Sequence, residues 1–142
     1  MKEITIKDLD KIATDLVNKA QKNKTKKATI LAFYGDLGTG KTTITQAICK
    51  ILGVKEKIIS PTFVIMKKYK INNGRFKNLI HIDAYRIEKS SELVRLGWEE
   101  IISDQNNLVI IEWPEKIQEI IPKDAITINL SHINESTRSI CY

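Results

Sequence analysis

Cysteine is scarce in this chain of 142 residues, and its two copies, Cys49 and Cys141, lie far apart in the sequence. They form no C-x-x-C pair, and this usage fits a reduced, cytoplasmic protein. Long apolar runs are also missing, because no stretch of the sequence is long enough to span a bilayer. The first ten residues, MKEITIKDLD, include no apolar signal segment, so we expect a protein that is neither exported nor bound to a membrane.

Arginine is scarce as well, since the 23 basic residues comprise four arginines and 19 lysines. A net charge of +6 can indicate nucleic-acid binding. Here, however, lysine dominates in a chain that is also rich in isoleucine and asparagine, which indicates a biased residue supply rather than a set of phosphate-binding arginines. No DNA binding is expected. The lysines between positions 22 and 27 are interpreted as a solvated loop, with an RNA or protein contact as the alternative.

Neither internal repeats nor low-complexity segments divide the chain. Its length and its 42% hydrophobic content predict one domain, residues 1–142, with a substantial core. A chain of this size is too small for a two-domain kinase.

The most informative pattern is GDLGTGKT at residues 35–42, which matches G-x-x-x-x-G-K-[ST] at Gly35, Gly40, Lys41 and Thr42. Residues 28–34 before it are a β-rich apolar run and predict a buried strand. Residues 42–52 after it place apolar side chains at helical spacing. A strand, a glycine loop and a helix in this order are the context that identifies a Walker A phosphate-binding loop.

The chemistry of phosphate binding requires these residue types. Glycines let the backbone approach a phosphate closely, and the loop N–H groups form an anion-binding nest at a helix N-terminus. Lys41 can reach the β- and γ-phosphates of ATP, and the Thr42 hydroxyl can ligate Mg²⁺. The alternative is a glycine-rich turn without a ligand, which would leave Lys41 without a counter-charge. We expect the nucleotide to contact Asp36, Leu37, Gly38, Thr39, Gly40, Lys41, Thr42 and Thr43.

Hydrolysis also needs an acidic group that holds the metal or orients water. Residues 108–112 read LVIIE, four apolar residues and a carboxylate, which is the form of a Walker B strand ending in Glu112 beside the loop. Its alternative is an ordinary strand end. A second acid, Asp83, lies in HIDAYR at residues 81–86, where Arg86 follows it and the pair could sense a γ-phosphate. His81 in the same motif is interpreted as a packed, hydrogen-bonded histidine rather than a catalytic one.

The remaining elements follow from periodicity and turn signals. Residues 5–20 predict a helix that begins with a capping box of Thr5 and Asp8. Two β-rich runs, residues 63–69 and 75–82, flank the turn signal Asn73–Gly74 and predict a hairpin. Further predictions are a helix from position 90 or 91 to 102, a short helix at 114–121, and strands at 125–130 and 138–141.

These elements predict an α/β fold of the P-loop NTPase type, with three layers and helices on both faces of the sheet. The sheet is expected to be mixed, parallel around the phosphate loop and antiparallel at one side because of the hairpin. Thr62, in SPTF at residues 60–63, lies between loop and hairpin. It is predicted to be a switch element whose hydroxyl reaches the nucleotide, or else a simple turn residue.

Five motifs now stand in one order: GDLGTGKTT, SPTF with a following Tyr69, HIDAYR, ELVRLGWEE at residues 92–100, and IEWPE at 111–115. Together they resemble the TsaE family, also called YjeE, over about residues 35–115. The family is a bacterial P-loop ATPase of tRNA threonylcarbamoyladenosine synthesis. The resemblance implies partnership with TsaD and TsaB, the proteins that place a threonylcarbamoyl group on adenosine 37 of tRNAs reading ANN codons. It also implies contact with tRNA only through that complex, and a weak, partner-dependent ATPase that is not itself the transferase.

The resemblance also implies roles for individual residues. Thr42 and Glu112 match the Mg²⁺ positions, Lys41 the phosphate lysine, and Asp83 an acidic position tied to ATPase activity. Thr62 falls in a switch-like segment, and Trp113 matches a tryptophan next to the metal glutamate. Near the chain ends, Arg138 matches a C-terminal arginine, and Leu9 stands where relatives usually have a threonine near the adenine.

Two other functions compete with an ATPase that acts on a protein complex. A small-molecule kinase would need an arginine-rich lid and a substrate-binding insertion, whereas this chain has four arginines and only the short hairpin. A nucleotide-binding scaffold that never hydrolyses is the third possibility. Phosphate release, measured with and without partners, separates the three.

Overall fold

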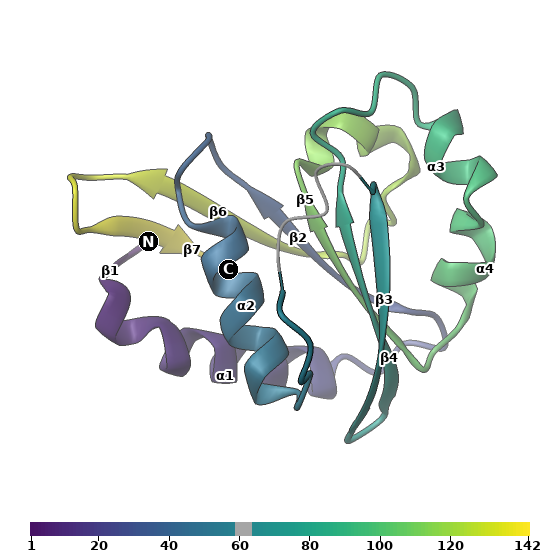
Figure 1. Ribbon diagram of the computed structural model, residues 1–142, viewed down its shortest axis with the longest axis horizontal. Coiled ribbons are helices and arrows are strands. Elements are labelled where there is room, and N and C mark those ends of the chain that lie inside the picture. Colours follow the sequence, from purple (N-terminus) through teal and green to yellow (C-terminus); the bar gives the residue numbers. More distant parts are fainter. Residues whose placement is uncertain (59–63) are drawn as a thin grey trace.

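The computed structural model describes residues 1–58 and 64–142. Its centre is a seven-stranded sheet with helices packed against it (Figure 1). Its strand order is β1-β7-β6-β2-β5-β4-β3. The strands are β1 Lys2–Ile4, β2 Thr29–Tyr34, β3 Met66–Asn73, β4 Phe76–Asp83, β5 Asn107–Glu112, β6 Ile126–His132 and β7 Arg138–Cys141.

The centre of the sheet is parallel, since β2 pairs in parallel with both β5 and β6, and β4 with β5. The hairpin of β3 and β4 makes one edge antiparallel, as predicted. The other edge is antiparallel as well, because β7 pairs antiparallel with β6 and with β1, and this pairing was not predicted. The three residues of β1 are too few to give a periodic signal, so the sequence did not reveal this edge.

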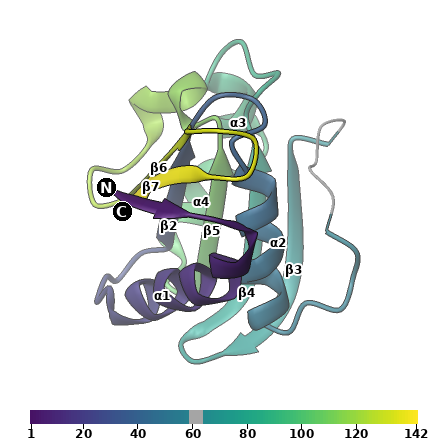
Figure 2. The same ribbon diagram turned by 90° about the vertical axis from the view of Figure 1, so that its left-hand side faces the viewer.

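Helices cover both faces of the sheet, which confirms the three-layer prediction. Figure 2 shows α1 (Leu9–Lys22) and α2 (Lys41–Ile51) in front of the sheet, with α3 (Ser91–Arg95) and α4 (Trp98–Ser103) behind it. The 3₁₀ helix η2 (Pro114–Ile120) packs on the α4 side through Ile117. The longest of the described helices, α1, has 14 residues, and none of them has the length and apolar character that crossing a membrane requires.

Two helical predictions needed correction. The helix expected to run from position 90 or 91 to 102 is two short helices, because Gly97 between them adopts φ +94°, a left-handed conformation that ends α3 and begins α4. The first helix begins with a 3₁₀ turn, η1 (Ile6–Asp8), before α1. Its predicted capping interaction is present, since the Thr5 backbone N–H donates to Asp8 Oδ2 at 2.8 Å.

Strand alternation decides which side chains face α2. Leu79 of β4 packs with the α1 and α2 core, whereas Ile80 and Ile82 pack with the core on the opposite face. His81 and Asp83 therefore share the α2 face with Leu79, because successive side chains of a strand point to opposite faces. The same alternation puts Glu112 of β5 on that face, and Asp83 and Glu112 are paired directly across the two strands.

The two thiols lie in contrasting environments, and we expect them to react differently. Cys49 of α2 is fully buried in the α1 and α2 core, and burial raises the pKa of its thiol to about 12, whereas Cys141 is exposed. Because the thiolate is the reactive form, a thiol reagent at pH 8 should label one cysteine per native chain and two after denaturation. Rapid labelling of two thiols in the native protein, or of any thiol in the native Cys141→Ser variant, would contradict this assignment.

Candidate functional site

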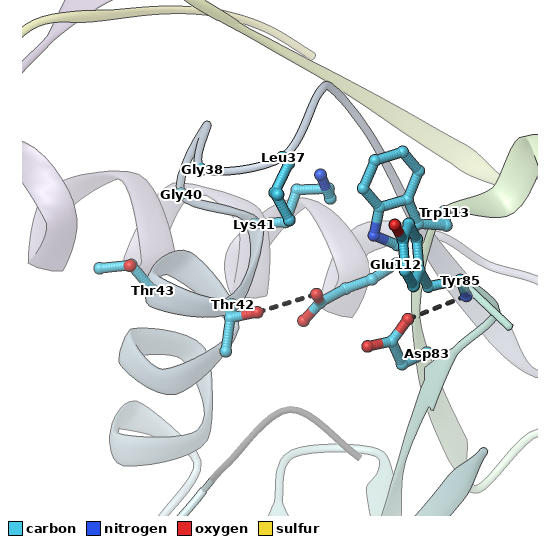
Figure 3. Close-up of a pocket in the computed structure, with 10 residues that line it drawn as sticks. All are labelled: Leu37, Gly38, Gly40, Lys41, Thr42, Thr43, Asp83, Tyr85, Glu112 and Trp113. Atoms are coloured by element: carbon cyan, nitrogen blue, oxygen red, sulfur yellow. Dashed lines mark hydrogen bonds between the residues drawn. The ribbon is translucent and has the colours of Figure 1, made fainter. Parts of the chain in front are cut away.

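A cavity of about 370 Å³ opens where β2, β4 and β5 end (Figure 3). Ligands of open α/β sheets characteristically bind outside the carboxyl ends of the strands. The loop after β2, the start of α2 and the ends of β4 and β5 contribute the lining. The lining residues are Leu37, Gly38, Gly40, Lys41, Thr42, Thr43, Asp83, Tyr85, Glu112 and Trp113.

The loop between β2 and α2 depends on glycine at two places. A Cβ at Gly35 would lie 2.6 Å from the Leu130 carbonyl oxygen and 2.7 Å from Thr39 Oγ1, so no larger residue fits without a backbone shift. Gly40 caps α2 with φ +100°, which favours glycine. The Thr39 hydroxyl closes the loop internally by donating to the Asp36 carbonyl at 2.8 Å. The first turn of α2 lines the pocket, and the N–H groups of a first helical turn have no partner within the helix, which suits them to bind an anion.

Lys41, the first residue of α2, is buried at the wall of the pocket. Its Nζ donates to the carbonyls of Gly35 and of Asp36, the latter at 2.9 Å, and lies 4.1 Å from the centre of the Trp113 ring. Burial lowers the pKa of Lys41 below the ordinary lysine value, and the negative charge of Glu112 partly opposes this shift. The ammonium group is thus held inside the loop, where a bound phosphate would sit.

Thr42 and Glu112 meet across the pocket, as Figure 3 shows. Thr42 Oγ1 donates to Glu112 Oε2 at 2.9 Å, and the Glu112 side chain is only 2% exposed. The other carboxylate oxygen, Oε1, lies 2.9 Å from Nε2 of His81. A hydroxyl and a carboxylate are hard oxygen donors, which suit Mg²⁺ when nucleotide phosphates and water complete the shell.

Asp83 lies beside Glu112 at the end of β4 and is 7% exposed. Its Oδ1 accepts the backbone N–H of Tyr85 at 3.0 Å, which fixes the carboxylate at the pocket wall (Figure 3). Two carboxylates from neighbouring strands thus face one cavity. Carboxylates have the chemistry to ligate a metal ion and to accept a hydrogen bond from water.

Two aromatic rings border the acidic pair. The rings of Tyr85 and Trp113 lie with centroids 5.0 Å apart, and Tyr85 is 47% exposed. Trp113 adopts φ +59°, and it is the one non-glycine residue with positive φ in the described part of the chain. Such a conformation costs roughly 1–2 kcal/mol and is common at functional sites. Trp113 directly follows Glu112 in the sequence, and in this backbone conformation its indole ring contacts the ammonium group of Lys41.

The sequence-predicted residues divide between two adjoining cavities. Eight line the first: Leu37, Gly38, Gly40, Lys41, Thr42, Thr43, Asp83 and Glu112. Thr39 and Arg138 line a second cavity of about 390 Å³, which shares Gly38, Gly40 and Thr43 with the first and also contacts Leu9. Asp36 is exposed on the loop and contributes its carbonyl to Lys41. Thr62 and its segment lie outside the described residues.

The interpretation of His81 as a packed, hydrogen-bonded histidine is confirmed, but its partner was not foreseen. The side chain is completely buried and contacts Glu112. Period-two spacing on β4, which puts His81 on the same face as Asp83, was the available signal. Tyr85 received no individual role from the sequence, because an exposed tyrosine after a strand has no distinctive pattern.

Comparisons with known proteins agree on one family. The profile of the family described as threonylcarbamoyl adenosine biosynthesis protein TsaE matches residues 5–140. The chain is 32% identical to the tRNA threonylcarbamoyladenosine biosynthesis protein TsaE of Bacillus subtilis, over 100% of this chain and 86% of the relative. It is 37% identical to the Rickettsia felis protein of the same description, over 77% of this chain, and spans only 61% of that relative's length. The crystal structure of YdiB from Bacillus subtilis superposes with a TM-score of 0.67 at 27% identity, covering 98% of this chain and 83% of that one.

Proposed function

This chain belongs to the TsaE family of threonylcarbamoyl adenosine biosynthesis proteins, and we propose that within that pathway it is a cytoplasmic, Mg²⁺-dependent ATPase. Its ATP turnover would support threonylcarbamoylation of adenosine 37 in tRNAs reading ANN codons. The observation that carries the proposal is the contact of Thr42 with Glu112 at 2.9 Å, next to a glycine loop whose carbonyls hold the Lys41 ammonium group.

ATP would lie across the two adjoining cavities. The phosphates occupy the first, against the N–H groups of the loop and the ammonium group of Lys41. The base and ribose occupy the second, which continues from the first around Gly38, Gly40 and Thr43 and has Arg138 on its wall. This orientation follows from the position of Lys41, which lines only the first cavity.

Thr42 and Glu112 would hold Mg²⁺ through Oγ1 and Oε2. When bound, the ion neutralises the negative charge that develops on the phosphate oxygens. The described residues contain no cluster of three or more His, Cys, Asp or Glu side chains that could bind a metal. A site with one carboxylate and one hydroxyl suits Mg²⁺, which is usually bound by few protein ligands together with phosphates and waters.

Asp83 would serve hydrolysis by accepting a hydrogen bond from the attacking water. Its Oδ1 accepts the Tyr85 backbone N–H at 3.0 Å, which fixes the carboxylate at the wall of the cavity that would hold the phosphates. Lys41 would stabilise charge on the transferred phosphoryl group as it forms. The chain's own residues therefore supply phosphate binding, metal binding and water orientation, and the threonylcarbamoyl transfer itself belongs to other proteins.

A protein partner would complete the site, and we propose TsaD and TsaB for this role, with tRNA contacted only through them. Leu37 on the loop is 76% exposed and Tyr85 is 47% exposed, so apolar side chains border the pocket on the solvent side. Exposed apolar side chains around a concave site are typical of contact surfaces. Coverage by a partner would exclude water, which strengthens electrostatic stabilisation of the transition state.

We expect this chain to hydrolyse ATP slowly alone and to sustain repeated rounds of tRNA modification when TsaD and TsaB are present. The test is a reconstitution over many turnovers, with and without this chain, together with its ATP-dependent binding to the TsaD–TsaB pair. Phosphate release is measured in parallel, because a non-hydrolysing scaffold would bind ATP without releasing phosphate. If the chain neither binds the pair nor supports repeated modification, the pathway role is wrong and a generic P-loop ATPase remains.

A further inference from the structure

Glu112 is the centre of a chain of three side chains, in which His81 and Glu112 are buried and Thr42 is partly exposed in the pocket. Its Oε2 accepts from Thr42, and its Oε1 lies 2.9 Å from His81 Nε2. We propose that His81 is a positioning residue: it holds the Glu112 carboxylate in the orientation that presents Oε2 to Thr42 and to the metal. This inference rests on the proposed function, since it concerns how the proposed Mg²⁺ ligand is prepared for binding.

The sheet brings His81 and Glu112 together. In the parallel pairing of β4 and β5, His81 lies opposite Ile110, and Glu112 is two positions further along the same face. The two side chains are 0% and 2% exposed, so water does not compete for their contact. The pocket lining includes Glu112 but not His81, which places the imidazole behind the carboxylate and out of reach of a nucleotide.

The surroundings of the ring fix which nitrogen carries its proton. Nδ1 of His81 is buried and has no hydrogen-bond partner among the described residues. A proton on Nδ1 would leave a buried N–H with no acceptor in residues 1–58 and 64–142, and would turn the Nε2 lone pair toward the carboxylate. The geometry therefore assigns the proton to Nε2, which donates to Glu112 Oε1. Oε1 is occupied by this bond, so Oε2 is the oxygen that remains for the pocket.

The hydrogen bond from His81 to the proposed metal ligand Glu112 has a measurable consequence. Without a donor at Oε1, the Glu112 side chain can rotate, and metal binding must then order it. Residues that orient metal ligands in this way typically contribute about 10- to 100-fold to metal affinity or activity. A purely structural histidine would instead affect binding of metal-free nucleotide and of the metal complex alike.

The experiment compares ATP affinity in Mg²⁺ and in EDTA by calorimetry, for the wild type, His81→Leu and His81→Gln. We expect His81→Leu to lose about tenfold or more of the affinity gained from Mg²⁺, while affinity in EDTA stays within about twofold. His81→Gln keeps an N–H donor close to the position of Nε2 and should retain the gain within about threefold. If the leucine variant does not fold, His81→Asn replaces it, because its shorter side chain cannot bring a donor to Glu112.

Asn78→Leu is the matched control. Asn78 lies on the same strand, is buried, and donates to Asn107 of β5 at 3.0 Å, so its loss also breaks a buried β4–β5 side-chain bond. Asn78→Leu should lower thermal stability without changing the increase in ATP affinity that Mg²⁺ produces. The inference is overturned if Mg²⁺ raises the ATP affinity of His81→Leu as much as that of the wild type. It is also overturned if Asn78→Leu loses as much of this Mg²⁺-dependent affinity as His81→Leu does. A wild type that gains no affinity from Mg²⁺ overturns the proposed metal site itself, an outcome that the wild-type titration alone reveals.

Discussion

Replacing Asp83 by asparagine should lower ATP hydrolysis by roughly 100-fold or more, while affinity for ATP stays within about tenfold. The amide has the same size as the carboxylate, and its oxygen can still accept the Tyr85 N–H that Asp83 Oδ1 accepts at 3.0 Å. What disappears is the negative charge that would orient and polarise the attacking water. Lys41 and the Thr42–Glu112 pair remain, so binding of nucleotide and metal is largely preserved.

Asp104→Asn controls for the local geometry of this substitution. Asp104 Oδ1 accepts the backbone N–H two residues ahead, that of Asn106, at 2.9 Å, which is the same type of turn as at Asp83. Asp104 is not among the lining residues of the pocket, so its variant should hydrolyse ATP at the wild-type rate. Phosphate release and calorimetric titration of both variants decide the role. Equal losses of turnover and affinity in Asp83→Asn would make Asp83 a binding or structural residue.

Replacing Lys41 by alanine should weaken ATP binding by roughly 1.5–3 kcal/mol, the usual contribution of a hydrogen bond to a charged group. This range corresponds to about 10- to 150-fold in the dissociation constant. The ammonium group lies inside the loop, between the carbonyls of Gly35 and Asp36 and the ring of Trp113, where no other described lysine lines the pocket. No second lysine is therefore in place to take over this contact within the described residues.

Lys50→Ala separates this local effect from a general change in charge. Lys50 is exposed in the last turn of the same helix, α2, far from the loop. Its removal lowers the net charge by the same amount and should leave ATP affinity within about twofold. Calorimetry on both variants provides the comparison. An unchanged affinity in Lys41→Ala would refute the assignment of this cavity to the phosphates.

The sequence predicted the phosphate loop and its flanking elements because their signals are local. The glycine spacing, the apolar run of β2 and the helical spacing of α2 all fall within 25 consecutive residues, roughly the window in which periodicity and turn chemistry act. The placement of Glu112 beside the loop was also predictable. A short apolar strand ending in an acid must deliver that acid to the carboxyl edge of a parallel sheet, where the loop lies.

Local signals failed where a single residue or a short segment decided the structure. The apolar residues of positions 93–102 keep helical spacing, yet Gly97 adopts φ +94° and divides the helix in two. Edge strand β1 has three residues, and only its pairing with β7 makes it a strand. In both cases the periodic spacing of apolar residues carries no information about the contact or backbone conformation that decides the structure.

By itself, the sequence determined the class of fold, the place of the glycine loop between β2 and α2, and the position of Asp83 and Glu112 at strand ends. The tertiary structure alone decided how these groups support one another. Thr42 and Glu112 are 70 positions apart, and His81 and Glu112 are 31 apart, and both contacts depend on strand order and register. The stacking of Trp113 on Lys41 likewise requires α2 and the end of β5 to meet. Residue types fix what a side chain can do, whereas the packing of distant segments fixes which partner it has.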